Sequence, residues 1–258
     1  MFETEILYPI PYMAELYEEP NVESENWKIR TFEVTMNDYR AIYDQGILPG
    51  KYVSLNKKNV GGFENTCMMS DTPMERFTNQ EFVNNACGRV LIAGLGIGMV
   101  PAAIAEKDDV ESITILEIDQ EIIDLVEPLI RKYIPNQDKI TIVQADALTY
   151  PDTYNGEKYD WAWLDIWPEF PNSEEDFDMF EKLFTKYNQI LHKPFCNGWG
   201  YEYAAAVGFG IEEINPIETD AFAAYVRAML DERETMRLLK QAREIRNKIN
   251  IDGKDIAI

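Results

Sequence analysis

Short apolar runs alternate with helical patterns through the middle of the chain. Helical sequence over 99–105 and 120–126 follows two runs that are rich in β-branched and aliphatic residues. Strands that alternate with helices are typical of βαβ units and a parallel sheet. The runs that have the composition of buried strands are 90–93, 112–116, 140–143 and 159–164.

This pattern divides the chain into three zones. Residues 1–85 show short strands and turns, residues 86–200 carry the βαβ pattern, and residues 201–258 read as a helical extension. We therefore expect an α/β fold with a Rossmann-like, mostly parallel sheet and helices on both of its faces. A small β-rich N-terminal region would precede that sheet, and a long C-terminal helix would follow it.

Local signals mark the ends of several elements. Gly61 and Gly62 lie between apolar runs at 52–55 and 65–69 and suit a hairpin. Asp119 is expected to cap the helix that begins at Gln120, and Pro128 is expected to start a fresh helical turn. Residues 195–207 match no strand pattern well, so we expect the sheet to be shortened there.

The C-terminal helix is expected to begin at Thr219–Asp220, which are good capping residues. Its apolar side chains form one stripe that would be costly to leave in water, at about 1.5 to 3 kcal/mol for each large side chain. The stripe predicts either core packing or a contact between subunits of a homo-oligomer. Its members include Phe222, Val226, Met229 and Met236.

Charge and cysteine content narrow the classes of function. The chain has 46 acidic and 24 basic residues, a net charge of −22, which opposes binding to nucleic acid or to an anionic membrane. The longest apolar stretch, 90–104, is broken by three glycines and is too short to span a bilayer. No secretory signal opens the sequence, so we expect a cytoplasmic protein. Three widely spaced cysteines and one histidine, His192, give no metal-ligand pattern.

A glycine loop follows the first strand of the βαβ region. Gly94, Gly96 and Gly98 come directly after the strand and before helical sequence, as in nucleotide-binding folds. Glu117 ends the next strand about 20 residues later, where a carboxylate accepts hydrogen bonds from ribose hydroxyls. Asp146 follows the third strand. It could accept a hydrogen bond from an adenine amino group or could cap the next helix.

Asp165 ends the fourth strand at the same edge of the sheet. With only one histidine in the chain, a carboxylate is the natural candidate for a general base, and Asp165 is best placed. Trp167 would either wall the pocket and contact a cation through its ring or serve ordinary packing. Asp71, Asp160 and Glu169 are candidates for a second carboxylate, and we assign Asp71 and Trp167 to substrate binding.

These signals together resemble the class I S-adenosylmethionine-dependent methyltransferase superfamily, and most of all its spermidine-synthase-like branch. Glu117-Ile118-Asp119, Asp146-Ala147 and the strand-end Asp165 are similar to that branch, and so is the aliphatic Ile92 two residues before the first glycine. The segment 69–75 looks similar to the substrate-side strand of those enzymes. The resemblance covers about 100 to 120 residues.

The resemblance implies S-adenosylmethionine or its decarboxylated form as the cofactor, and a small-molecule substrate such as a cationic amine. In place of the Ser/Thr-Asp-Pro that follows the catalytic aspartate of aminopropyltransferases, this chain has Ile166-Trp167-Pro168. Nor does the chain have the Pro-Pro-aromatic motif of DNA amino-methyltransferases. Three functions therefore stay open: a methyltransferase acting on a small molecule or protein side chain, an aminopropyltransferase acting on a polyamine, and a non-catalytic nucleoside-binding or assembly protein.

Overall fold

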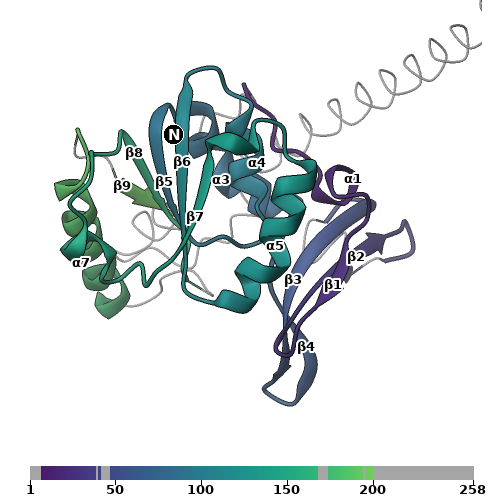
Figure 1. Ribbon diagram of the computed structural model, residues 1–258. Helices are drawn as coiled ribbons and strands as arrows, with labels where there is room; N and C mark the ends of the chain where they lie inside the picture. The colour runs from purple at the N-terminus through teal and green to yellow at the C-terminus, as the bar shows by residue number, and fades with distance from the viewer. Residues whose placement is uncertain (1–6, 39, 42–46, 168–173, 194–195, 200–258) are drawn as a thin grey trace, which may run out of the picture.

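The computed structural model describes residues 7–38, 40–41, 47–167, 174–193 and 196–199. It contains two sheets, a five-stranded parallel sheet and a four-stranded antiparallel sheet (Figure 1). The parallel sheet is flanked by helices, and the antiparallel sheet lies to one side of it next to α5 (Figure 1). The predicted C-terminal helix and the rest of the 201–258 extension fall outside the described residues.

The parallel sheet confirms the predicted Rossmann-like fold. Its strand order is β7-β6-β5-β8-β9, so the first strand of the unit, β5, lies in the centre and the chain moves outward from it in both directions. All four neighbouring pairs are parallel. Such an order leaves a crevice where the direction of winding reverses, between β5 and β8. The strands are β5 Gly88–Ala93, β6 Val110–Glu117, β7 Ile140–Gln144, β8 Trp161–Leu164 and β9 Cys196–Gly198.

Successive residues of the central strand enter different cores, because side chains of a strand alternate between its faces. Val90 and Ile92 pack with α4 (Met99–Ala105) and α5 (Gln120–Tyr133). Leu91 and Ala93 pack with α7 (Glu174–Gln189) on the opposite face. Burial on both faces explains why these strands are nearly continuous apolar runs in the sequence.

Helix α5 corrects the expectation at Pro128. The helix continues through this proline to Tyr133 instead of restarting there. Pro128 and Asp124, whose carbonyl loses its helical hydrogen-bond donor, are both exposed, so water can satisfy that carbonyl. A buried stripe keeps the helix packed on the sheet along its whole length. Its members are Ile122, Ile123, Val126 and Ile130.

The antiparallel sheet has the order β1-β2-β3-β4 and forms most of the N-terminal region. Its last two strands form the predicted hairpin, with Gly61 and Gly62 in the turn at positive φ. The strands extend closer to the turn than the sequence pattern indicates. The elements of this region are α1 Met13–Leu16, β1 Asn21–Glu23, β2 Trp27–Val34, β3 Gly50–Val60 and β4 Phe63–Ser70.

Two further segments differ from expectation. The end of the β-rich zone is a helix, α3 (Pro73–Asn85), which starts with proline at its first position and buries Phe77, Phe82 and Val83. The segment after 195 contains a short strand, β9, that pairs in parallel with β8. Strand β9 is only three residues long, too short for a periodicity to be read. The remaining short elements are η1 Gln137–Lys139 and α6 Tyr150–Thr153.

Candidate active site

A cavity of about 710 Å³ opens at the carboxyl ends of the parallel strands. This is the edge at which open α/β sheets bind their ligands. The cavity lies between this edge on one side and α3 with the antiparallel sheet on the other. The sheet edge contributes Gly94, Gly96, Glu117, Asp146, Asp165 and Trp167, and the opposite side contributes Trp27, Leu55, Met69, Met74 and Glu75.

The glycine loop is shaped by contacts within the protein. Gly94 has φ +102°, and a Cβ atom there would lie 2.0 Å from the carbonyl oxygen of Asp165. A Cβ atom at Gly96 would lie 2.0 Å from Sδ of Met69. The backbone contact leaves no room for a side chain at Gly94 beside β8, and Gly96 has positive φ, +52°, next to the flexible side chain of Met69 in β4. Gly98 lies outside the cavity lining, at the N-cap of α4 beside the hydroxyl of Tyr17.

We expect Gly94→Ala to destabilise the protein by about 2 to 4 kcal/mol, because the methyl group would force apart the ends of β5 and β8 and alanine disfavours this φ. Thermal unfolding measures the loss. Gly62→Ala is the matched control, since Gly62 also has positive φ but a Cβ there meets no atom within 4 Å. Equal melting temperatures for the two variants would contradict the close approach to Asp165.

Glu117 is held in place by two backbone amides. Its Oε2 accepts a hydrogen bond from Leu95 N at 3.1 Å, and its Oε1 accepts one from Asp119 N at 2.9 Å. The side chain is buried, and burial raises the pKa of this carboxyl despite the two hydrogen bonds. Each oxygen retains acceptor capacity toward the cavity, so two adjacent hydroxyl groups of a ligand could be bound.

Asp146 caps the turn before α6 and also lines the cavity. Its Oδ1 accepts a hydrogen bond from Leu148 N at 2.9 Å, and its carbonyl oxygen accepts from Tyr150 N at the start of α6. The residue also lines the cavity. Capping of the turn therefore does not remove Asp146 from the candidate site, because it fixes the carboxylate at the cavity wall.

Asp165 faces a second carboxylate that the sequence did not indicate. Asp165 and Glu75 both line the cavity, one from the end of β8 and the other from the first turn of α3. Burial raises the pKa of Asp165 to about 7. Burial and the nearby charge of Asp165 raise the pKa of Glu75 well above its usual range, although a hydrogen bond with Trp199 opposes this. Such a pair can hold and transfer a proton near neutral pH.

Three tryptophan rings line the same cavity as this carboxylate pair. Trp167 lines the cavity and stacks on Phe180 of α7 with ring centroids 3.7 Å apart, so it is both a packing residue and a wall. Trp163 stacks on Phe82 at 4.9 Å, and the indole of Trp199 donates to the hydroxyl of Thr78 at 2.9 Å. Fixed aromatic faces beside carboxylates are suited to an organic cation.

Asp71 does not line the cavity, although its neighbour Ser70 does. It is fully buried, and its two carboxylate oxygens accept hydrogen bonds from Met13 N at 2.8 Å and Val53 N at 2.6 Å. Burial raises its pKa to about 6. The structure thus gives Asp71 the contacts of a structural residue joining α1 to β3, and the cavity-facing acid of this segment is Glu75.

The other two candidates for a second carboxylate do not reach the site either. Asp160 precedes β8 and accepts a hydrogen bond from Arg89 N at 2.8 Å, at the amino ends of the strands. This is the opposite edge of the sheet from the cavity. Glu169 lies outside the described residues.

Three apolar side chains at the cavity are unusually exposed. Ile118 is 65% exposed, Leu148 is 47% exposed and Ile166 is 36% exposed. Exposed aliphatic side chains around a concave site are suited to cover a planar ring such as a nucleobase. Together with the carboxylate of Glu117, they give the cavity both apolar and hydrogen-bond-accepting groups.

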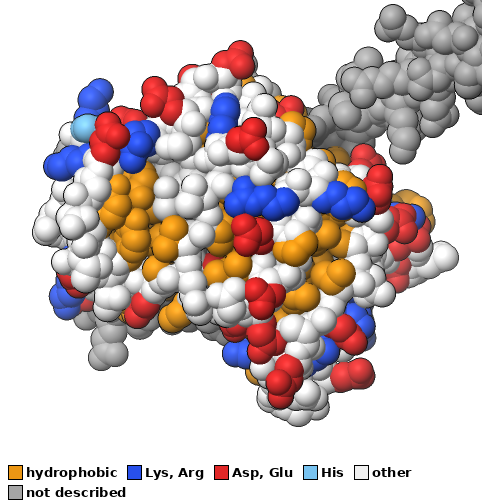
Figure 2. All heavy atoms as spheres, viewed as in Figure 1, with side chains coloured by type: hydrophobic (Ala, Val, Ile, Leu, Met, Phe, Trp, Pro, Cys, Tyr) orange, Lys and Arg blue, Asp and Glu red, His pale blue; other side chains and the backbone are white. Residues whose placement is uncertain are grey.

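Neither the distribution of surface charge (Figure 2) nor a cluster of metal ligands marks a further site in the described residues. Acidic and basic side chains intermingle on the face drawn in Figure 2. Within the part of the chain that the structure describes, no group of three or more His, Cys, Asp or Glu residues could hold a metal ion. Nor is any helix in those residues long and apolar enough to cross a bilayer.

Comparison with known proteins gives a family-level match. Residues 67–192 match the model of the spermine/spermidine synthase domain. A search among curated proteins finds no match. The fold is similar to that of a spermidine synthase from Thermotoga maritima, at 16% identity and a TM-score of 0.41 over 67% of this chain and 52% of that one. It is also similar to the N-methyltransferase NodS from Bradyrhizobium japonicum WM9, at 16% identity and a TM-score of 0.34 over 47% of this chain and 64% of that one.

The match to the spermidine synthases spans about half of their length. The domain match begins at Cys67, within β4, and ends at His192, just after α7. It therefore includes the glycine loop, Glu117, Asp146 and Asp165, and it leaves out most of the antiparallel sheet. Residues 67–192, just under half of the chain, are therefore similar to the spermine/spermidine synthase domain.

Proposed function

We propose that this protein is a transferase that binds a sulfonium nucleoside of the S-adenosylmethionine type and moves an alkyl group from it to an amine. The observation that carries the proposal is the meeting of four strand ends at one cavity. Gly94, Glu117, Asp146 and Asp165 lie at the carboxyl ends of four different strands and line the same cavity. In this assignment Glu117 binds the ribose, Asp146 contacts the base, and Asp165 lies beside the transferred group.

When bound, the sulfonium nucleoside would supply an electrophilic carbon next to a positively charged sulfur. The protein's contribution is then to position the acceptor and accept its proton. Asp165 is the proposed proton acceptor, because its pKa of about 7 makes it basic enough to take a proton and available as a carboxylate at neutral pH. Glu75 is proposed to share that proton and to hold the ammonium form of the acceptor before reaction.

The charge of the cavity favours a donor without a carboxylate. Among the described residues that line it, every charged type is acidic: Glu75, Glu117, Asp146 and Asp165. The methionine carboxylate of S-adenosylmethionine would be repelled by these groups, whereas the decarboxylated donor carries only positive charge. This observation favours aminopropyl transfer over methyl transfer, with a methyltransferase as the alternative.

Calorimetric titration of the full chain with three nucleosides tests this assignment. We expect S-adenosylhomocysteine to bind, and decarboxylated S-adenosylmethionine to bind about tenfold more tightly than S-adenosylmethionine at pH 8, since one repulsive charge contact costs about 1.4 kcal/mol. Tighter binding of S-adenosylmethionine would show that the protein is a methyltransferase instead. Lack of binding by all three would refute the proposed function.

A further inference from the structure

The antiparallel sheet contacts both loops of the candidate nucleoside site. Trp27, the first residue of β2, donates a hydrogen bond from its indole Nε1 to Oδ2 of Asp119 at 2.7 Å. Met69, near the end of β4, accepts a hydrogen bond at Sδ from Ile97 N at 3.2 Å. One contact reaches the turn after the ribose-binding strand and the other reaches the glycine loop. The sheet is thus joined to both loops by a side-chain hydrogen bond.

Asp119 connects Trp27 to the proposed ribose-binding carboxylate. Its backbone N–H donates to Oε1 of Glu117 at 2.9 Å. Its second carboxylate oxygen, Oδ1, accepts a hydrogen bond from Glu121 N at 2.9 Å and caps α5. Asp119 therefore holds Glu117 with its backbone and is itself held at both oxygens. Loss of the Trp27 bond would free one of these oxygens and loosen the turn.

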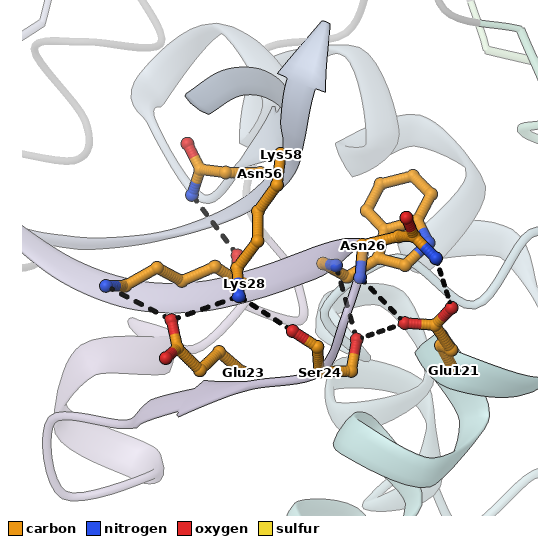
Figure 3. A network of polar contacts seen from close by, with 8 residues as sticks. Glu23, Ser24, Asn26, Lys28, Asn56, Lys58 and Glu121 are labelled. Atoms are coloured by element: carbon orange, nitrogen blue, oxygen red, sulfur yellow. Dashed lines mark hydrogen bonds and ion pairs between the residues drawn. The ribbon is translucent and has the colours of Figure 1, made fainter. Parts of the chain in front are cut away.

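The loop that carries Trp27 is anchored independently of the ligand cavity. Glu121, in the first turn of α5, accepts hydrogen bonds from Ser24 Oγ at 2.5 Å, from Asn26 N at 2.9 Å and from Asn26 Nδ2 at 2.6 Å. Figure 3 shows Ser24 and Asn26 converging on this carboxylate. The anchored loop places Trp27 so that its side chain is only 7% exposed and lines the cavity.

We propose that Trp27 is a positioning residue of the nucleoside site, which holds the turn from Glu117 to Asp119 in the conformation that binds ribose and walls that end of the cavity with its indole. This inference rests on the proposed function. It extends the site into the antiparallel sheet, since Trp27 lies 40 residues before the start of the matched domain at Cys67. The ligand recognised through this contact is the ribose of a purine nucleoside.

The test is Trp27→Phe, which keeps an aromatic ring and removes the N–H donor to Asp119. We expect the affinity for S-adenosylhomocysteine to fall about tenfold, and the affinity for its 2′-deoxy analogue to fall at most about twofold, because the second ligand makes less use of Glu117. The dissociation constant of the 2′-deoxy analogue divided by that of S-adenosylhomocysteine, the deoxy ratio, therefore decreases in the variant. General destabilisation would weaken both ligands equally and leave that ratio unchanged.

Two further variants complete the test. Asp119→Asn can keep the cap of α5 through its amide oxygen, while its NH₂ group faces the indole N–H of Trp27. We therefore expect the same decrease in the ratio of dissociation constants. Combining Trp27→Phe with Asp119→Asn should cause no further loss, because both substitutions remove the same hydrogen bond. Trp161→Phe, at the amino end of β8 outside the cavity, removes an indole bond to Cys87 and is expected to bind both ligands like wild type. Unchanged ratios in Trp27→Phe and Asp119→Asn would overturn the inference while leaving the nucleoside site intact. Failure of the wild-type chain to bind would overturn both.

Discussion

Replacement of Glu117 by alanine is expected to weaken the binding of S-adenosylhomocysteine about 100-fold or more. The substitution removes the acceptor of the backbone amides of Leu95 and Asp119, and it also leaves the ribose hydroxyls without a partner. Each buried donor without an acceptor costs about 1 to 3 kcal/mol, and 100-fold corresponds to about 2.8 kcal/mol. Isothermal titration calorimetry measures the affinity directly.

Two controls separate ribose binding from general damage. Glu111→Ala removes an exposed acid near the other end of the same strand, and we expect wild-type affinity. Glu117→Gln keeps one amide oxygen as an acceptor but turns an NH₂ group toward a backbone donor, so an intermediate loss is expected. If Glu117→Ala bound the nucleoside as tightly as Glu111→Ala, Glu117 would have no role in ribose binding.

Asp165→Asn is expected to reduce turnover by about 100-fold to 10,000-fold while changing nucleoside affinity only a few-fold. The amide cannot accept the proton of the acceptor amine, but it fills the same space. Because the pKa of Asp165 is raised to about 7, the wild-type rate should rise between pH 6 and pH 8 as this carboxyl ionises. Single-turnover kinetics with any amine that supports wild-type turnover would measure both effects. Wild-type turnover in the variant would give Asp165 a structural role.

The carboxyl group of Asp165 should also make the free energy of unfolding depend on pH. Its pKa in the folded protein lies above its ordinary value, so the folded state binds this proton more tightly than the unfolded state does. The contribution of Asp165 to stability is therefore greatest below about pH 4 and is lost as pH rises to about 7. We expect Asp165→Asn to be more stable than wild type at pH 8, by on the order of 1 to 3 kcal/mol, and similar at pH 4. Thermal melts at both pH values measure this difference.

The sequence allowed the parallel sheet, and the edge of it at which the cavity lies, to be predicted because their signals are local. Strands buried on both faces produce apolar runs, and parallel strands place all of their carboxyl ends at one edge. Glu117, Asp146 and Asp165 each follow such a run, so their meeting at one cavity could be inferred without coordinates. The spacing from the glycine loop to Glu117, about 20 residues, favoured a nucleoside as the ligand of this cavity.

The residues that sequence reasoning missed reach the cavity through tertiary contacts. Glu75 was hidden because the segment around it resembles a strand, whereas α3 starts there and turns this side chain toward Asp165. Trp27 lies 90 residues before Glu117, and no local pattern shows that its loop docks on α5. Only the fold of the antiparallel sheet brings it to the turn from Glu117 to Asp119.

Asp71 shows the opposite limit of sequence reasoning, because its contacts in the fold differ from those that its sequence position suggests. An acid ahead of a glycine loop resembles a substrate ligand in the sequence, but its environment is set by α1 and β3, which supply the two backbone donors. Whether a carboxylate faces solvent, a cavity or two buried amides depends on packing that a one-dimensional pattern does not contain. Gly98 is a similar case, since its positive φ serves the start of α4 beside Tyr17.

A crystal structure of the full chain with S-adenosylhomocysteine tests the proposed nucleoside site directly. We expect both ribose hydroxyls within hydrogen-bonding distance of Glu117, with the adenine near Asp146 and the sulfur on the side of Asp165 and Glu75. We also expect the indole of Trp27 against the ribose end of the ligand. A nucleoside bound elsewhere, or bound with its ribose turned away from Glu117, would contradict the assignment of this cavity.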